Sequence, residues 1–259
     1  SSNVDHVLLN SPVLSQRKLH QLLTLPRFAT AYRYIDLYFD DETSLQQALD
    51  RICAQAEEAV RAGDELLILS DRRPRRGAAA VHALLATGAV HQHLVNTGLR
   101  CSTNLIIETG TARDPHHFAC LIGFGATAVY PYLAYQTLHV LGRRGILGGK
   151  THGEPEQFGR SYRRGVKKGL LKILSKMGIG SIASYRGAGL FEIVGLSDAV
   201  VARCFEGTPS RIGGAGFARL EADARSLAAL GWDDDAVPEV GGLLHYVHGG
   251  EYHQYNPDV

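Results

Sequence analysis

The feature that most constrains this chain is an alternation of short apolar segments with longer amphipathic ones. Strand-like segments of about five residues, some of them continuously apolar, occur at 32–38, 65–70, 104–108 and 126–130. Segments whose apolar residues recur at helical spacing lie between them, at 42–62, 78–96 and 116–123. Strands with apolar residues on both faces are typical of a parallel sheet covered by helices. The pattern predicts an α/β fold, a mostly parallel sheet with flanking helices, arranged as an open sheet or as an incomplete β/α barrel.

Local signals place the ends of these helices. Asp41 is expected to cap the first helix, and Asp114 to cap the helix that follows at 116–123. Glycines suit the helix ends, as Gly63 does after the first helix. The second helix is expected to break near Thr87 and Gly88. Pro131 suits the first turn of a further helix.

The second half of the chain departs from this regular alternation. Residues 141–158 are rich in glycine and charge and are interpreted as a mobile excursion. The remaining expected elements are helices at 156–177, 197–205 and 216–230 and a strand at 181–185. A glycine- and aromatic-rich tail occupies 241–259, and residues 1–259 are treated as one domain.

Composition excludes several classes of protein. Hydrophobic residues make up 45% and charged residues 20%, which is typical of a globular domain. The net charge of +1 argues against a strongly basic nucleic-acid binder, although basic stretches at 72–76 and 160–168 leave an RNA-binding hypothesis, which predicts steeply salt-dependent binding. No apolar run approaches the roughly 20 residues needed to cross a bilayer. We therefore expect neither a nucleic-acid nor a membrane partner, and a cytoplasmic location.

The cysteines and the chain start carry further expectations. The four cysteines include no C-x-x-C pair, so neither a zinc ribbon nor an iron–sulfur cluster is predicted, and they are interpreted as reduced core residues. None of the histidine groups has convincing ligand spacing, so no metal site is predicted. The chain begins at Ser1 and its single methionine is Met177, which indicates a processed chain or a piece of a longer one.

The best site that the residues alone indicate follows the third strand. Glu108 and Thr109 end that strand, and Asp114, His116 and His117 follow. Ligands of parallel α/β sheets bind outside the carboxyl ends of the strands, so this loop is a candidate site. The alternative, which we favour, is that Asp114 caps a helix and Glu108 balances a buried arginine.

Several long segments carry a family likeness. They are SPVLS at 11–15, LVNTGLRCSTNLIIETGTARDPHHFACLIGFGATAVYPYLAYQTL at 94–138, KGLLKILSKMGIGSIASYRGAGLFEIVGL at 168–196, FEGTPSRIGG at 205–214 and the ending GGLLHYVHGGEYHQYNPDV. Together they cover nearly the whole chain in collinear order, and they resemble the central domain of the large (alpha) subunit of bacterial, NADPH-type glutamate synthase.

The resemblance implies a place within a large enzyme. In that family an amidotransferase domain hydrolyses glutamine, and ammonia passes through a tunnel to an FMN-binding (β/α)8 domain with a 3Fe–4S cluster, where 2-oxoglutarate becomes glutamate. A small NADPH-oxidising subunit with FAD and 4Fe–4S clusters supplies electrons. The implied partners of this chain are those two domains of the same polypeptide and that small subunit.

The departures from the family's catalytic parts are as informative as the matches. The chain starts with Ser1 rather than a nucleophilic cysteine and has no clustered cysteines, so we assign it no catalytic, cofactor-binding or metal residues. We expect an inactive scaffold domain that links the two catalytic domains and helps form the ammonia path. The candidates for interdomain or tunnel contact are Glu108, Thr109, Ser184, Arg186, Ser210 and Arg211. The rival hypothesis is a free-standing α/β module that binds a small molecule or an anion.

Overall fold

A four-stranded parallel sheet lies at the centre of the fold. The computed structural model describes residues 7–147, 155–237, 246, 248–249, 252, 254 and 256–257. The strands, in spatial order, are β1 (Tyr32–Asp36), β3 (Leu66–Ser70), β5 (Asn104–Glu108) and β6 (Ala128–Tyr130). They are joined in turn by α2 (Leu45–Arg61), α3 (Ala83–Asn96) and α4 (Pro115–Gly123). Each strand therefore pairs with the next parallel strand along the chain, as the sequence alternation predicts.

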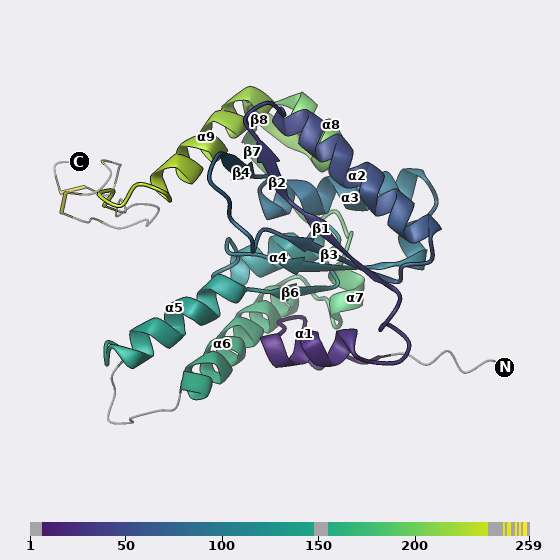
Figure 1. Cartoon of the computed structure of the whole chain (residues 1–259), viewed down its shortest axis with the longest axis horizontal. Helices are drawn as coiled ribbons and strands as arrows, with labels where there is room; N and C mark the ends of the chain where they lie inside the picture. Colours follow the sequence, from purple (N-terminus) through teal and green to yellow (C-terminus); the bar gives the residue numbers. More distant parts are fainter. Residues whose placement is uncertain are drawn as a thin grey trace.

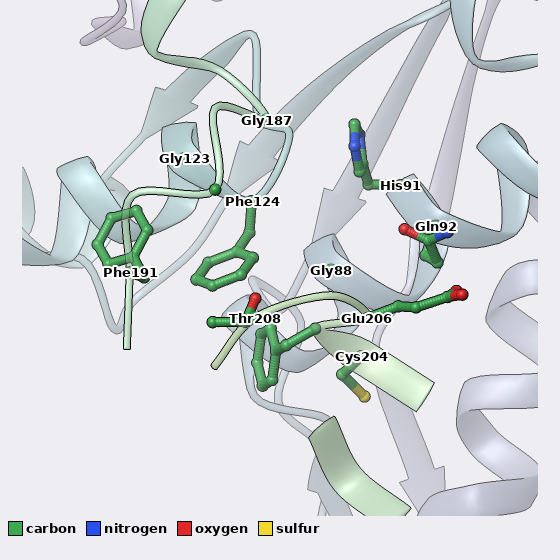
Figure 2. A pocket seen from close by; sticks show the side chains of 12 residues that line it. Gly88, His91, Gln92, Gly123, Phe124, Gly187, Phe191, Cys204, Glu206 and Thr208 are labelled. Carbon is green, nitrogen blue, oxygen red and sulfur yellow. The ribbon is translucent and has the colours of Figure 1, made fainter. Parts of the chain in front are cut away.

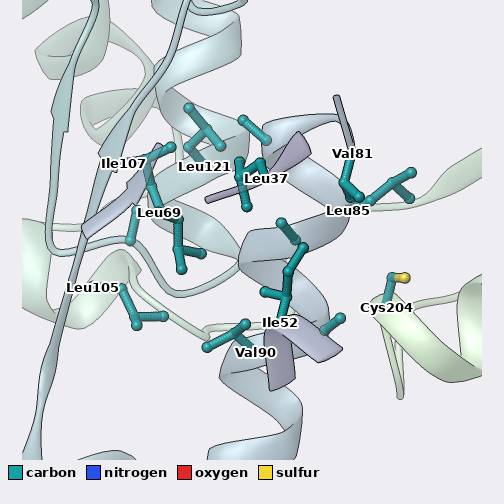
Figure 3. Packing of buried hydrophobic residues seen from close by; sticks show 14 of the residues in the cluster. Leu37, Ile52, Leu69, Val81, Leu85, Val90, Leu105, Ile107, Leu121 and Cys204 are labelled. Atoms are coloured by element: carbon teal, nitrogen blue, oxygen red, sulfur yellow. The ribbon is translucent and has the colours of Figure 1, made fainter. Parts of the chain in front are cut away.

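The two faces of this sheet are covered by different helices. Leu67 and Leu69 of β3 belong to the larger core, which they share with α2, α3 and α4. Leu66 and Ile68 point the other way, into a smaller core with Leu19 of α1 (Gln16–Leu23), because successive strand side chains alternate between faces. Figure 1 shows α2 and α3 on one side of the sheet and α1 on the other. Figure 3 shows Leu69, Leu105 and Ile107 of the sheet facing the helical residues Ile52 and Val90.

Two smaller sheets accompany the central one. β2 (Tyr38–Asp40) pairs antiparallel with β4 (Ala78–Ala80). β7 (Ile193–Leu196) pairs parallel with β8 (Ser210–Ala215), with α8 (Asp198–Cys204) between them and α9 (Phe217–Leu230) after them. Across the described residues no ladder joins β6 to β7 or β8 to β1, so the structure contains an open sheet and no closed barrel. The predicted α/β class, mostly parallel with flanking helices, is confirmed.

The helices α5 (Tyr132–Arg143) and α6 (Pro155–Lys176) lie side by side and extend away from the sheet (Figure 1). The helix predicted at 156–177 is confirmed, and its residues Val166, Leu170 and Leu174 are buried. The ends of the predicted excursion, 141–143 and 155–158, belong to these helices, and its centre at 148–154 lies outside the described residues. Most of the 241–259 tail also lies outside them.

Several predicted boundaries were wrong. The N-cap of α2 is Ser44, whose hydroxyl accepts from Gln47 N while the Gln47 side chain accepts from Ser44 N. Asp41 instead forms an ion pair with Arg225 of α9 at 2.9 Å. The expected helix from 78 begins only at Ala83, because Ala78–Ala80 pair with β2 as strand β4.

The helix α3 also runs unbroken through Thr87 and Gly88. The Thr87 hydroxyl donates to the Ala83 carbonyl at 2.7 Å, and Gly88 lets the helix lie against the Cys204 carbonyl, where a Cβ would collide. Gly88 is thus a packing position and not a breaker.

Other differences concern residues 182–185 and the cysteines. Residues 182–185 form one helical turn, α7 (Ile182–Tyr185), capped by Ser181, and not a strand. The cysteines are free as predicted, but only Cys53 and Cys204 are buried; Cys101 is exposed and Cys120 half-buried. None of the helices in the described ranges is long and apolar enough to cross a membrane.

Candidate functional site

Polar side chains from neighbouring strands meet at the carboxyl edge of the central sheet. Ser70, the last residue of β3, is paired in register with Glu108, the last residue of β5. The residues that follow these strands, Asp71 and Thr109, are therefore neighbours as well. Asp71, Glu108 and Thr109 are only 6%, 3% and 0% exposed. We refer to these residues with Arg72, Tyr38 and Tyr132 as the carboxyl-edge network.

Both oxygens of the Glu108 carboxylate accept hydrogen bonds within the chain. Ser70 Oγ donates to Glu108 Oε2 at 2.6 Å, and Arg72 Nη1 donates to Oε1 at 3.1 Å. The Arg72 guanidinium lies 5.6 Å from the ring centroid of Tyr130 and 5.7 Å from that of Tyr132. Glu108 therefore balances an arginine, as the alternative interpretation of this position predicted.

Asp71 is the second buried acid of the network. Thr109 Oγ1 donates to Asp71 Oδ2, and the Gly110 amide donates to Oδ1 at 2.9 Å. The hydroxyls of Tyr38 and Tyr132 each donate to the Asp71 carbonyl at 3.0 Å. Burial raises the pKa of the Asp71 carboxyl, and the hydrogen bonds from Thr109 and Gly110 oppose that rise.

Tyr38 and Asp71 of this network also line a cleft. This cleft, of about 710 Å³, lies between α9 on one side and β4 with the first turn of α3 on the other. Its polar lining includes Tyr38, Asp71 and Thr111, and the Trp232 side chain lines it as well. The Arg76 guanidinium lies 5.0 Å from the Trp232 ring centroid. Most of the remaining lining is apolar: Leu45, Pro74, Ala78, Ala80, Val81, Leu84, Leu85, Leu196, Phe205, Leu220, Ala224, Leu227 and Ala228.

The acceptor groups of this network are already used within the chain. Each carboxylate oxygen of Asp71 and Glu108 already accepts a hydrogen bond from this chain. Burial raises the pKa of Tyr38 to about 12 and that of Tyr132 further, so both phenols stay protonated at neutral pH. A general base or nucleophile needs an acceptor that is free to reach a substrate. Each carboxylate oxygen of the carboxyl-edge network already has one donor from this chain, and the lining of the cleft beside it is mostly apolar.

The structure places the six sequence candidates at three separate positions. Glu108 and Thr109 belong to the carboxyl edge. Arg186 lies at the opposite edge, where its Nη1 donates at 2.9 Å to Oγ1 of Thr127, the residue that precedes β6. Ser184 lies in the short helix α7, which ends just before Arg186. Its hydroxyl forms a hydrogen bond of 2.9 Å with that of Ser181.

The third position is strand β8. Arg211 forms an exposed ion pair with Glu192 at 3.3 Å. The Ser210 hydroxyl is buried, and none of the described residues forms a hydrogen bond with it. The three positions do not converge on one site.

Sequence reasoning missed the partners of Glu108 and Thr109. Asp71 directly follows the predicted strand 65–70, so the same strand-end rule that selected Glu108 could have found it. Arg72 lies in the basic stretch at 72–76, and nothing in the sequence singled it out from its basic neighbours. The loop residues Asp114 and His117 form a capping box on α4, as the structural alternative expected. The described residues contain no group of three or more possible metal ligands.

A second cavity of about 110 Å³ lies among aromatic residues (Figure 2). The Phe124 ring packs against those of Phe191 and Phe205, with centroids 5.1 and 4.7 Å apart. His91 of α3 lines the same cavity and points away from these rings (Figure 2).

Comparison with known proteins gives a consistent result. A family model described as the glutamate synthase central domain matches residues 1–197. Ferredoxin-dependent glutamate synthase 2, chloroplastic, of Arabidopsis thaliana is 40% identical over 273 residues, which cover 99% of this chain and 16% of that protein. The glutamate synthase (NADPH) large chain of Bacillus subtilis is 38% identical over 257 residues, covering 98% of this chain and 16% of that one. The chain thus spans about 16% of the length of these curated relatives.

Among solved structures, a DHODH of Eimeria tenella in complex with ferulenol is similar with a TM-score of 0.39 and 16% identity. That alignment covers 61% of this chain and 38% of the other.

Proposed function

The chain belongs to the glutamate synthase central domain family, and on that premise we propose that it acts as a non-catalytic scaffold in a glutamate synthase large chain. The larger enzyme would make glutamate from glutamine and 2-oxoglutarate with a reductant. Within it, this domain would link the amidotransferase and FMN-binding domains and help form the ammonia path. FMN and the 3Fe–4S cluster would belong to the neighbouring domain, and FAD with 4Fe–4S clusters to a small NADPH-oxidising subunit. The proposed compartment is the cytoplasm.

The observation that carries this proposal is that the acidic groups of the carboxyl-edge network are hydrogen-bonded by residues of this chain. Ligands of open parallel sheets bind in the crevice outside this edge. Here Glu108 pairs with Arg72, and Asp71 with Thr109 and Gly110, so the edge is held by its own residues. A rigid edge without free reactive groups suits a part that positions other domains.

Exposed apolar residues support contact with such domains. Val194 of β7 and Ile212 of β8, which are paired in register, are 66% and 60% exposed. Apolar side chains that stand together on a surface favour coverage by another protein surface. We assign this face, rather than the central sheet, to interdomain contact.

The first experiment tests the scaffold role. The purified 259-residue chain is incubated with glutamine, 2-oxoglutarate and a reductant, and its absorbance is recorded for bound flavin. We expect neither glutamate formation nor retained flavin. Either one would overturn the proposal.

The second experiment tests the ammonia path in a large chain that carries this sequence as its central domain. Arg186→Ala is compared with Arg164→Ala, a change at an exposed arginine of α6. We expect Arg186→Ala to increase the glutamine hydrolysed per 2-oxoglutarate consumed, while Arg164→Ala leaves that ratio unchanged. An unchanged ratio in both variants would contradict a role of Arg186 in coupling.

The cleft of about 710 Å³ favours one alternative function, a free-standing module that binds a small molecule. This alternative predicts that phosphate, 2-oxoglutarate or FMN raises the melting temperature of the isolated chain, because a ligand that binds only the folded state stabilises it. The scaffold role predicts no rise with FMN.

A further inference from the structure

A cluster of basic side chains lies at the amino-terminal edge of the central sheet, away from the carboxyl-edge network. It consists of His91 from α3, Arg100 from the 3-10 turn η1 (Arg100–Ser102) and Arg186. Arg100 Nε donates to His91 Nδ1 at 2.9 Å. Arg186 bonds Thr127, directly before β6, and Arg100 bonds the carbonyl of Thr103, directly before β5. We call these three residues the amino-edge cluster.

The positive charge of this cluster is not balanced by any acid in the described part of the chain. Besides His91, Arg100 donates only to the carbonyls of Thr103 and Gly125, both at 2.7 Å. Arg186 donates to the Thr127 hydroxyl at 2.9 Å. The described residues give neither guanidinium an ion pair. Most other arginines of the fold that are partly buried, such as Arg72 and Arg225, do pair with a carboxylate.

The two guanidinium groups are close enough to repel each other and the imidazole. Burial, and then the charge of Arg186, lowers the pKa of Arg100 to about 10. Burial, and then Arg100 and Arg186, lowers the pKa of His91 to about 4. Like charges held together in a partly buried position cost free energy, and a bound anion would reduce that cost.

The geometry also leaves hydrogen-bond donors for such an anion. Because His91 Nδ1 accepts from Arg100, the neutral ring carries its proton on Nε2. Nε2 lies beside the loop that follows Arg186, 3.9 Å from the point where a Cβ on Gly187 would be. Arg186 retains N–H groups beyond the one given to Thr127. His91 and Gly187 also line the cavity of about 110 Å³ (Figure 2).

We propose that Arg186, Arg100 and His91 Nε2–H form a binding site for one carboxylate group. Arg100 is held by three neutral acceptors, which leaves Arg186 as the arm able to form two parallel bonds to a planar carboxylate. The group could belong to a small acid in solution or to an Asp or Glu side chain of a neighbouring domain. The carboxylate site itself does not depend on the proposed scaffold function. Only a carboxylate supplied by a neighbouring domain rests on that function.

The first arm of the test uses the 259-residue chain with acetate as the probe, at constant ionic strength against chloride. NMR follows the arginine Nε–H signals and the titration of His91. We expect a saturable shift of the Arg186 signal and a rise of the His91 pKa with acetate. In Arg186→Gln we expect acetate to bind at least tenfold more weakly. In the control Arg164→Gln, a change at an exposed arginine of α6, we expect acetate to bind as it does to the unaltered chain.

Two results would overturn the proposal. One is the absence of a saturable acetate response, or a response that Arg186→Gln retains in full. The other is binding of phosphate without binding of acetate, which would assign the cluster to a tetrahedral anion. Because the chain alone is used, neither result bears on whether it is a scaffold domain.

The second arm distinguishes the two sources of the carboxylate. The same titrations are made on a glutamate synthase large chain that carries this sequence. A side chain from a neighbouring domain would raise the His91 pKa without added acetate and would block the acetate response. A free acid as the source would leave the response as it is in the isolated chain.

Discussion

Replacing Thr109 by valine tests whether the carboxyl-edge network stabilises the fold. The Thr109 side chain is fully buried. Its hydroxyl donates to Asp71, lies 2.9 Å from the Thr111 hydroxyl and accepts from the Thr111 amide at 3.0 Å. Valine keeps the shape of the side chain and removes all three interactions.

The expected loss follows from the charge on Asp71. A hydrogen bond to a charged group contributes about 1.5–3 kcal/mol, and the buried carboxylate would lose its bond from Thr109 while it keeps the one from Gly110. We expect Thr109→Val to lower the free energy of unfolding by about 2–3 kcal/mol at pH 7.5. For a domain of this size each kcal/mol changes the melting temperature by roughly 2–4 °C, so a fall of about 4–12 °C is expected.

The loss should depend on pH in a defined direction. Burial raises the pKa of Asp71 in the folded state, so its stabilising contribution is complete below the unfolded pKa of about 3.9 and is lost as the pH rises through the folded pKa. Thr109→Val removes a donor that favours the ionised form and raises the folded pKa further. The difference between variant and parent should therefore be largest at neutral pH and shrink toward pH 4.

Urea unfolding at pH 7.5 and at pH 4.5 measures the loss in the free energy of unfolding and its dependence on pH. Thr109→Ser is the control, because it keeps the hydroxyl and loses one methyl group, at a cost of about 1 kcal/mol that does not change with pH. Equal losses for the valine and serine variants, or a valine loss independent of pH, would refute the assigned role of the Thr109 hydroxyl.

Other positions allow direct tests of the packing. Gly88→Ala should lower the free energy of unfolding by about 3 kcal/mol in urea, because the added Cβ meets the Cys204 carbonyl. Gly165→Ala, within α6 and with open space around it, should raise that free energy by roughly 0.5–1 kcal/mol; equal effects at the two glycines would contradict this packing. Cys101 should react first with a thiol reagent in the folded chain, whereas Cys53 should react only on unfolding, since burial raises its pKa to about 11. Equal rates at both thiols would contradict the burial of Cys53.

The central sheet could be predicted from the sequence because its strands are short, apolar and separated by amphipathic helices. The segments 65–70 and 104–108 contain β3 and β5 almost residue for residue. The prediction fails where pairing with a distant segment decides the secondary structure. Ala78–Ala80 has the composition of a helix, yet it pairs with β2, which lies nearly forty positions earlier. Local composition cannot report a partner so far away along the chain.

The same limit applies to the candidate site. A strand-end rule found Glu108 and Thr109, but the register of β3 against β5 brings Asp71 and Arg72 to them, and a single sequence does not state a register. The amino-edge cluster was only partly visible. Arg186 was selected as a polar residue next to an apolar segment, while His91 and Arg100 join it through contacts between α3, η1 and the loop after α7.

The two edges of the sheet differ in how their charges are balanced, and this decides where a ligand can stabilise the domain. At the carboxyl edge each buried acid has its donors within the chain, so an added anion would compete with Glu108 and Asp71 for Arg72, Thr109 and Gly110. At the amino edge the charges of Arg100 and Arg186 have no acidic partner among the described residues, so an anion would remove repulsion there. An anion that raises the melting temperature should therefore lose its effect in Arg186→Gln and keep it in Thr109→Val.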